Sequence, residues 1–242
     1  MWKRLGIALF WLAAWQVLAL AVHNPVLLVG PWETLLALID MLPTPEFRRA
    51  LGGSLLHILG GFLLGGFLGF LLAFLSYSRP WIRELLAPVI GLMKTVPMVS
   101  FVVLILIWAG SRGLSLYVTA AVVLPILYLN TLEGLLGTDR KLTELAQVYH
   151  MGFFPRLRGI YLPGIKSQLL GALELAVGMA WKSGVAAEVI GQPVNSLGNS
   201  LYRAKIYLDT ERVLAVSAVT AILSWGLGKL VLLALRKGAR EK

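Results

Sequence analysis

The sequence predicts an all-α, polytopic membrane protein with six transmembrane helices. Of its 242 residues 58% are hydrophobic and only 14% are charged, whereas about a quarter of the residues in soluble domains carry charge. Several apolar runs approach or exceed the roughly 18–20 residues that cross a hydrocarbon core of about 30 Å. The net charge of +10 fits the excess of Lys and Arg on the cytoplasmic loops of membrane proteins.

The composition also excludes several classes of function. No aromatic-interleaved basic stretch is present, so we do not expect nucleic-acid binding. The chain has no cysteine, which removes disulfides and thiolate metal sites. The three histidines, at positions 23, 57 and 150, are scattered without metal-ligand spacing, so we expect no metal site.

The first span is predicted at residues 5–22, behind the basic start Met1-Trp2-Lys3-Arg4. A secretory signal peptide has the same pattern, but Trp11 and Trp15 are untypical of one, and an uncleaved signal-anchor helix is favoured. Residues 23–53 are less apolar and rich in proline. Within them, the helical periodicity of residues 32–41 predicts a short helix at the membrane interface.

The second and third spans differ in kind. The second, at residues 54–76, carries five glycines whose spacing lets neighbouring helices approach closely. The third, at residues 81–109, is too long for one straight crossing, and Pro88 and Pro97 each remove a backbone donor. Broken helices at membrane depth occur where protein or water covers them, so this segment is a candidate lining for a path. After a tight loop at residues 110–113, the remaining spans are predicted at residues 114–132, 165–190 and 213–235.

Six spans place both termini on one side of the membrane. With the N-terminus inside, thirteen Lys and Arg residues fall in cytoplasmic segments, Arg240 and Lys242 among them, and six fall in outer segments. This excess favours cytoplasmic N- and C-termini. Residues 133–164 then form the longest cytoplasmic loop.

That loop has the pattern of two short amphipathic helices. Apolar residues recur over 142–149, with Thr143 as the predicted cap of the first helix. Phe153-Phe154-Pro155 is predicted to end it, and Leu157 to begin a second piece, which Pro163-Gly164 would break before span five. Such a pair suits docking into a groove of another protein. A charged connector that merely joins two spans is the alternative interpretation.

The same loop resembles the cytoplasmic signature of ABC-importer permeases: Glu-Ala-Ala, three residues, Gly, nine residues, Ile, one residue and Leu-Pro. Here Glu144-Leu145-Ala146 begins the pattern, and Ile160 and Leu162-Pro163 close it at the proper distance. The chain departs from the pattern at Leu145 and at His150, where Ala and Gly are expected, and Gly152 is out of register. The resemblance implies ATPase-coupling roles for the following residues: Glu144, Leu145, Ala146, His150, Gly152, Leu162 and Pro163. For Glu144, a bond to the ATPase and a cap on its own helix both remain open.

Three further segments resemble permeases of nitrate/sulfonate/taurine-type importers: Lys94-Thr95-Val96-Pro97, residues 181–191 and Ser196-Leu197-Gly198. The resemblance implies the transmembrane domain of a type I importer, a single permease domain over residues 1–242. In it, residues 1–53 hold the first span and the interfacial segment, and residues 54–242 form the core importer region, with a coupling loop at residues 133–164.

The resemblance also implies the partners. They are two ABC ATPase subunits, which carry ATP and Mg, a second permease copy, with a homodimer favoured, and an external binding protein that is periplasmic or lipid-anchored. The implied location is the bacterial inner membrane, in contact with membrane lipid. The transported solute stays open among small anions and organic heterocycles.

Ionisable residues lie inside the apolar runs at Lys94, Glu174, Lys182 and Glu188. Inserting such a group at the centre of a helix costs about 3 kcal/mol or more, so each needs a partner or water. Glu174, Trp181 and Glu188 are spaced by seven residues, which places them near one stripe of a helix. We therefore predict that these five residues, together with Pro97, line a translocation path.

Structural alternatives exist for three of these charges. Lys94 could instead snorkel to the interface, and Lys182 could form an ion pair with a neighbouring helix. Glu188 could be a gate, a subunit contact or an interface residue.

Two other function classes compete with the permease. The sequence has no Gly-x-x-x-x-Gly-Lys-Ser/Thr loop, so we expect no ATP site of that kind in this chain and no enzymatic activity. A secondary transporter, the main alternative, would show paired halves with similar broken helices, and only one broken segment is evident. An intramembrane enzyme would require a catalytic motif that the chain lacks.

Overall fold

The computed structural model describes residues 2–237, which form eleven α-helices and one π-helical segment. Met1 and residues 238–242, including Arg240 and Lys242 of the predicted cytoplasmic set, lie outside the described residues. The elements in chain order are α1 (Trp2–Val22), α2 (Pro31–Met41), α3 (Pro45–Ser78), α4 (Pro80–Thr95), α5 (Met98–Ala109), α6 (Leu114–Leu136), α7 (Arg140–Val148), α8 (Phe153–Arg156), η1 (Leu157–Tyr161), α9 (Leu162–Gly191), α10 (Leu197–Ile206) and α11 (Thr210–Lys237).

The described residues hold five or six candidate membrane crossings. Five segments are long and apolar enough to cross by themselves, and the bent pair of α4 and α5 makes a sixth when it is counted as one span. The predicted all-α architecture is confirmed. The predicted interfacial helix corresponds to α2, whereas α3 is longer than the second predicted span and begins at Pro45. Helix α10 was not predicted.

The third span is broken at one of its two prolines. The axes of α4 and α5 differ by 104°, and the chain is extended at Val96, directly before Pro97. A residue that precedes proline is disfavoured in the helical region, which explains a break at this point. Pro88 lies inside α4 without ending it, so the predicted broken span is broken at Pro97 alone.

Caps and prolines in the sequence set several helix starts. Pro31, Pro45 and Pro80 each occupy the first turn of their helix, where a missing N–H costs nothing. Thr44 caps α3 by accepting a hydrogen bond from the Phe47 amide at 3.4 Å. These sequence signals determine where α2, α3 and α4 begin.

Helices α3, α6 and α9 form the packed centre of the molecule. Buried side chains of α3, α6, α9, α10 and α11 share the largest apolar cluster, with Ile58, Val123 and Trp181 among them. The most extensive contact in this centre is between α3 and α6. A Cβ atom on Gly65 would lie 2.5 Å from the carbonyl oxygen of Ala120, so the small residue permits this approach, as predicted for membrane helices.

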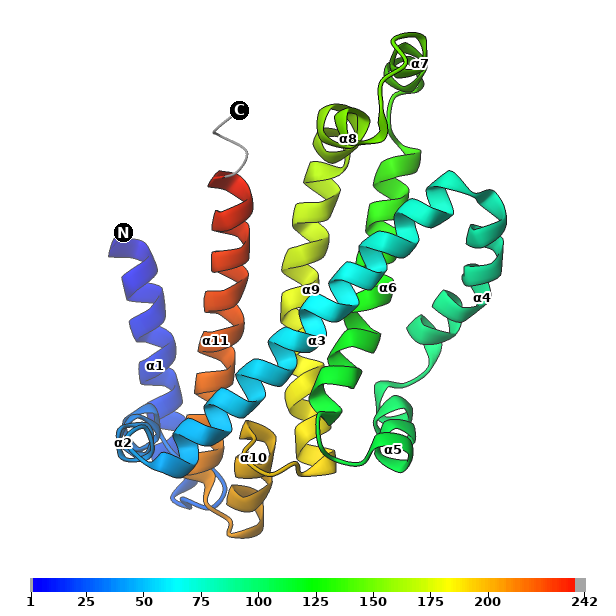
Figure 1. The fold of residues 1–242 in the computed structure, drawn as a ribbon. Helices are drawn as coiled ribbons and strands as arrows, with labels where there is room; N and C mark the ends of the chain where they lie inside the picture. The colour runs from blue at the N-terminus through cyan, green and yellow to red at the C-terminus, as the bar shows by residue number, and fades with distance from the viewer. Residues whose placement is uncertain (1, 238–242) are drawn as a thin grey trace.

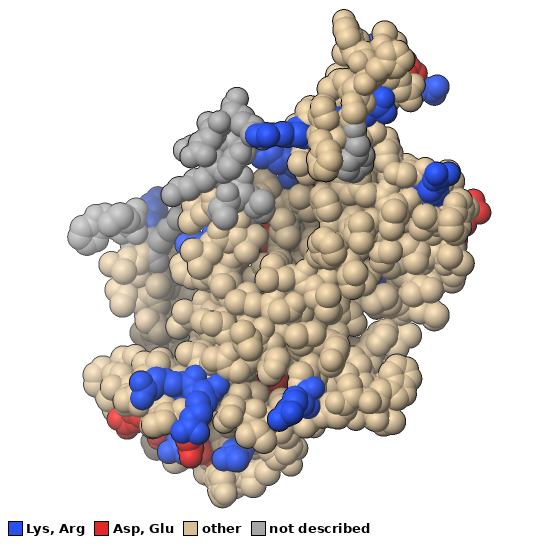
Figure 2. Space-filling model, in the orientation of Figure 1, with Lys and Arg blue, Asp and Glu red and all other residues tan. Residues whose placement is uncertain are grey.

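Different helices lie at the two ends of the bundle. Helices α7 and α8 project from one end, and the start of α1, the end of α11 and the corner between α3 and α4 lie toward that same end (Figure 1). Helices α2 and α10 lie at the opposite end (Figure 1). Lys and Arg gather at these two ends, with a broad band of other residues between them on the face shown in Figure 2. This distribution fits a protein whose middle section lies in lipid.

Candidate functional site

Helix α7 is a short, exposed amphipathic helix that projects from one end of the bundle (Figure 1). The Asp139 side chain caps it by accepting a hydrogen bond from the Lys141 amide at 2.9 Å. The prediction that Thr143 caps the helix was wrong, because the Thr143 hydroxyl lies inside α7 and donates to the Arg140 carbonyl at 2.8 Å. Asp139 precedes the first helical residue, the position at which an acceptor side chain satisfies a free amide.

One face of α7 is apolar and uncovered. Leu145 is 54% exposed and Val148 is 74% exposed, although both are large hydrophobic side chains. Tyr149, directly after the helix, is similarly exposed. An amphipathic helix with an uncovered apolar face has the surface that partner proteins bind in a groove.

Glu144 lies on the exposed side of α7, whereas Ala146 lies on its buried side. The Glu144 carboxylate accepts from the Arg140 guanidinium at 2.9 Å, and both side chains are exposed. Ala146 is fully buried, and its carbonyl accepts from Arg156 at 3.1 Å. Ala146 therefore holds α7 to the chain behind it, while Glu144 faces outward.

His150 has a backbone conformation that explains the glycine of the signature. Its φ is +48°, in the left-handed region that glycine adopts without steric cost. The Met151 amide then donates to the Ala146 carbonyl at 2.9 Å, which closes the end of the helix. His150 thus fills the role of the expected glycine at some cost in strain. Gly152 is exposed two residues further on.

The second part of the loop continues into α9. Phe153-Phe154-Pro155 begins a helix rather than ending one, and α8, η1 and α9 follow one another without interruption. The predicted break at Pro163-Gly164 is therefore wrong. In η1 the Leu162 amide donates to the Leu157 carbonyl, a wider turn than an α-helix has. Pro163 has no backbone amide to donate. The wider π-helical turn directly before it allows the helix to continue through the proline.

Aromatic contacts fix this segment to the membrane-spanning body. The Tyr161 ring lies edge-on to the ring of Tyr77, with 5.4 Å between centroids, and contacts Phe74 at 6.3 Å. Both partners come from the end of α3. Leu162 and Pro163 are exposed beside this contact. A displacement of α7 would therefore act on α3 and α9 through η1.

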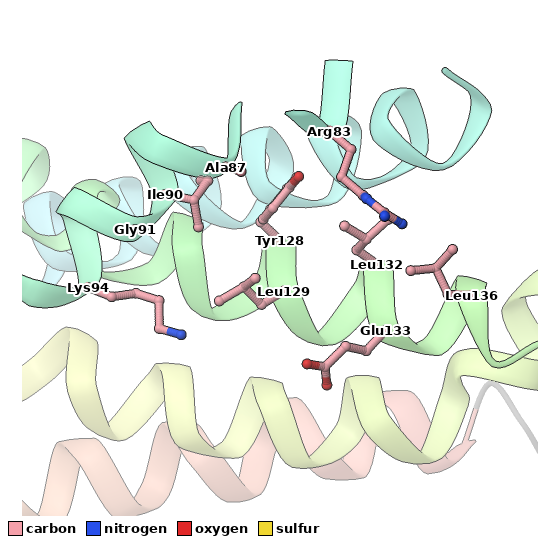
Figure 3. Close-up of a pocket in the computed structure, with 10 residues that line it drawn as sticks. All are labelled: Arg83, Ala87, Ile90, Gly91, Lys94, Tyr128, Leu129, Leu132, Glu133 and Leu136. Atoms are coloured by element: carbon pink, nitrogen blue, oxygen red, sulfur yellow. The ribbon is translucent and has the colours of Figure 1, made fainter. Parts of the chain in front are cut away.

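A cleft of about 500 Å³ lies between α4 and α6. It is open to the surface, and its walls combine apolar side chains with three charged ones, Arg83, Lys94 and Glu133 (Figure 3). Lys94 was predicted as a path residue from its place in the broken span. Pro97, at the break itself, is exposed three residues further on.

The structure separates the predicted path residues of α9 into two groups. Glu174 and Lys182 are exposed, whereas Trp181 and Glu188 are buried. The seven-residue spacing thus does not give the three stripe residues a common environment. Trp181 packs in the main apolar cluster. The roles of Glu174 and Lys182 in a path stay predictions.

Glu188 joins four helices. Its carboxyl group is fully buried and accepts from the Ser54 hydroxyl of α3 at 2.6 Å and the Ser115 hydroxyl of α6 at 2.9 Å. The Gly198 amide in the first turn of α10 donates to it at 3.1 Å. Ser54 in turn accepts from the Leu197 amide at 2.8 Å. This network fixes the end of the bundle that is remote from α7.

Sequence reasoning missed several of these residues. Ser54 and Ser115 are isolated hydroxyls near the ends of apolar spans, a signal that could have suggested a hydrogen-bonded partner. Arg83 and Glu133 were assigned to the cytoplasmic side without a site. Within residues 2–237, no group of three or more His, Cys, Asp or Glu side chains could hold a metal ion.

Comparisons with known proteins agree on one family. Residues 65–237 match the model of the binding-protein-dependent transport system inner membrane component family. The chain is 28% identical to a Bacillus subtilis protein described as the aliphatic sulfonates transport permease SsuC, over 87% of this chain and 77% of that protein. It is also 28% identical to the taurine transport system permease TauC of Escherichia coli, over 87% of this chain and 78% of that protein.

Solved structures show the same fold. An amino acid ABC transporter, described as crystallised with histidines, gives a TM-score of 0.62 at 18% identity, with 80% of this chain and 94% of that chain covered. A bacterial ABC transporter for import of the acidic polysaccharide alginate gives 0.65 at 16% identity, with 99% and 94% covered. The fold, the loop signature and the family match lead to one conclusion: the chain belongs to the family of binding-protein-dependent transport system inner membrane components, the permease subunits of ABC importers.

Proposed function

We propose that α7 is the element through which separate ATPase subunits drive this permease, and that the solute is a small anion or small organic molecule. Family membership implies an ATPase and a substrate-binding protein as partners. Two ATPase subunits and two copies of this chain make up the proposed complex. ATP and Mg are bound by the ATPase subunits, and the binding protein is periplasmic or lipid-anchored.

The observation that carries this proposal is the uncovered apolar face of α7 at the signature position. Leu145 and Val148 are exposed there, and η1 links α7 to the continuous helix of span five. A partner that binds α7 and displaces it would also displace α9. ATP can shift the permease between two states only if the bound partner contacts those states differently.

The proposed orientation places α7 and both termini in the cytoplasm. Support comes from the arrangement of the bundle, because the start of α1, the end of α11 and α7 lie at one end (Figure 1). Helices α7 and α8, at that end, carry Arg140, Lys141 and Arg156 of the predicted cytoplasmic set, and cytoplasmic loops are rich in Lys and Arg.

A second copy of this chain would complete the path in this proposal. Gln168, Glu174 and Lys182 are exposed on α9, although α9 lies in a segment long and apolar enough to cross the membrane. Charged side chains at membrane depth face a bundle interior or a water-filled cavity. A homodimer would place these residues between the two copies.

The relatives suggest which solutes to test. Proteins described as aliphatic sulfonates and taurine transport permeases are similar over most of this chain. A sulfonate of low molecular mass therefore comes first among the candidates. The binding protein would deliver it to the end of the bundle remote from α7.

Reversing the charge of Glu144 tests the docking role. Its ion pair with Arg140 is exposed, and such pairs contribute about 0–1 kcal/mol, so Glu144→Arg is expected to fold. We expect the recovery of ATPase with affinity-tagged permease to fall about tenfold, which corresponds to about 1.4 kcal/mol of binding free energy. ATP turnover in reconstituted vesicles is expected to fall with it.

Arg140→Gln is the matched control, because it breaks the same ion pair and leaves the carboxylate in place. We expect it to retain ATPase recovery. Normal recovery and turnover in Glu144→Arg would exclude the docking role of Glu144. An equal loss in Arg140→Gln would assign the effect to the ion pair rather than to the carboxylate.

A further inference from the structure

Three charged side chains of the α4–α6 cleft form no ion pair with any side chain that the structure describes. Arg83 and Lys94 come from α4 and Glu133 comes from α6. Among the residues whose side chains the structure describes, the ion pairs are Arg140–Glu144 and Arg212–Asp209, and neither lies in the cleft. The cleft thus carries both signs of charge in an unpaired state.

Lys94 lies in the last turn of α4, directly before the bend into α5. Its side chain is exposed and lines the cleft. A charge held at membrane depth marks a partner, a cavity or a substrate pathway. For Lys94, the cleft is the cavity.

Lys94 and Glu133 face one another along the cleft. Figure 3 shows the Lys94 ammonium and the Glu133 carboxylate extending toward each other beside Leu129. The Arg83 guanidinium extends in another direction, past Leu132 toward Leu136 (Figure 3). A volume of about 500 Å³ is within the range of small-molecule sites, in which a mainly apolar lining holds a few placed polar groups.

We propose that this cleft binds a small amphoteric solute in transit, with its acidic group on Lys94 and its ammonium group on Glu133. The inference rests on the proposed function and narrows the class of solute. A short apolar linker between the two solute charges would lie over Leu129. Charge-assisted hydrogen bonds form at both ends. A solute with a single charge leaves one protein group unpaired, so it is expected to bind more weakly than a solute that carries both charges.

The test uses the purified permease–ATPase complex without binding protein, so that selectivity of the binding protein does not enter. The unfolding temperature is measured with taurine, ethanesulfonate or ethylamine at one millimolar-range concentration, because a ligand that binds the folded state raises this temperature. Taurine combines the sulfonate of the second probe with the amine of the third. We expect taurine to give the largest rise.

Two variants assign the solute charges to the side chains. In Glu133→Gln, we expect taurine to lose its advantage over ethanesulfonate, while the response to ethanesulfonate remains. In Lys94→Gln, we expect the response to both sulfonates to disappear, while that to ethylamine remains. Leu136→Ala serves as the control for a general change at the cleft wall and is expected to preserve the order of the three probes.

Several results would overturn the proposal. Equal responses of the wild-type complex to all three probes, or no response to any, would show that the cleft does not recognise an amphoteric solute. A lower unfolding temperature in both variants with an unchanged order of probes would show that Lys94 and Glu133 only stabilise the fold. ATPase recovery is measured on the same preparations, so a failure of this inference with the ATPase still bound leaves the docking proposal intact.

Discussion

Replacing Glu188 by alanine is expected to lower the free energy of unfolding of the permease by about 3–5 kcal/mol. The carboxyl group accepts from Ser54, Ser115 and the Gly198 amide in a fully buried setting. Each buried donor left without an acceptor costs about 1–3 kcal/mol. The unfolding temperature of the detergent-purified protein, followed by far-UV circular dichroism, measures the effect.

Glu174→Ala on the same helix is the matched control. Glu174 is exposed, so its removal is expected to leave the unfolding temperature near that of the unmodified protein. Glu188→Gln keeps one oxygen acceptor and should fall between the two alanine variants. If Glu188→Ala unfolds at the same temperature as Glu174→Ala, the carboxyl group does not hold the four helices together.

Leucine at Gly65 is expected to destabilise the contact between α3 and α6 by about 3 kcal/mol, at the upper end of the usual cost of overpacking. The new Cβ would lie 2.5 Å from the Ala120 carbonyl oxygen and 2.8 Å from the Ala120 Cα. Both atoms belong to the backbone of α6 and cannot rotate away, so the helices must separate. The unfolding temperature and the amount of monodisperse protein recovered from membranes measure the loss.

Gly52→Leu on α3 is the control for the added leucine. A Cβ on Gly52 would meet no atom within 4 Å, so this variant is expected to behave like the parent protein. Equal stability of Gly65→Leu and Gly52→Leu would contradict the close packing of α3 on α6.

The helices that were predicted well are those for which hydropathy decides the structure. Residues 5–22, 32–41 and 114–132 each lie within a helix of the structure, because a long apolar run or a clear amphipathic period has few other solutions. Helix α10 was missed since its sequence, Leu197–Ile206, is short and polar. It forms against α9 and α11, a tertiary context that no local pattern reveals.

Proline positions were harder to interpret. Pro97 breaks a span, Pro88 and Pro125 lie inside helices, and Pro163 follows a π-helical turn. All four lack the amide donor. The outcome depends on whether the neighbouring turns can widen or the chain can leave the helix, and this depends on the surrounding packing.

The candidate site could be predicted only in part for the same reason. Lys94 was recognised from its place in an apolar run, whereas Glu133 was counted with the cytoplasmic loop because it lies near the end of α6. Only the packing of α4 on α6 brings the two into one cleft. Glu188 was expected to be a gate, a subunit contact or an interface residue, and its three donors come from segments far apart in the chain.

Chemical labelling of α7 is the most direct test of the central claim that this helix lies in the cytoplasm and binds an ATPase. The chain has no cysteine, so Val148→Cys introduces a single thiol at a position that is 74% exposed. The account predicts that a membrane-impermeant maleimide labels it in inside-out vesicles stripped of ATPase, and that added ATPase protects it. Labelling in sealed right-side-out vesicles, or labelling that the ATPase leaves unchanged, would contradict the account.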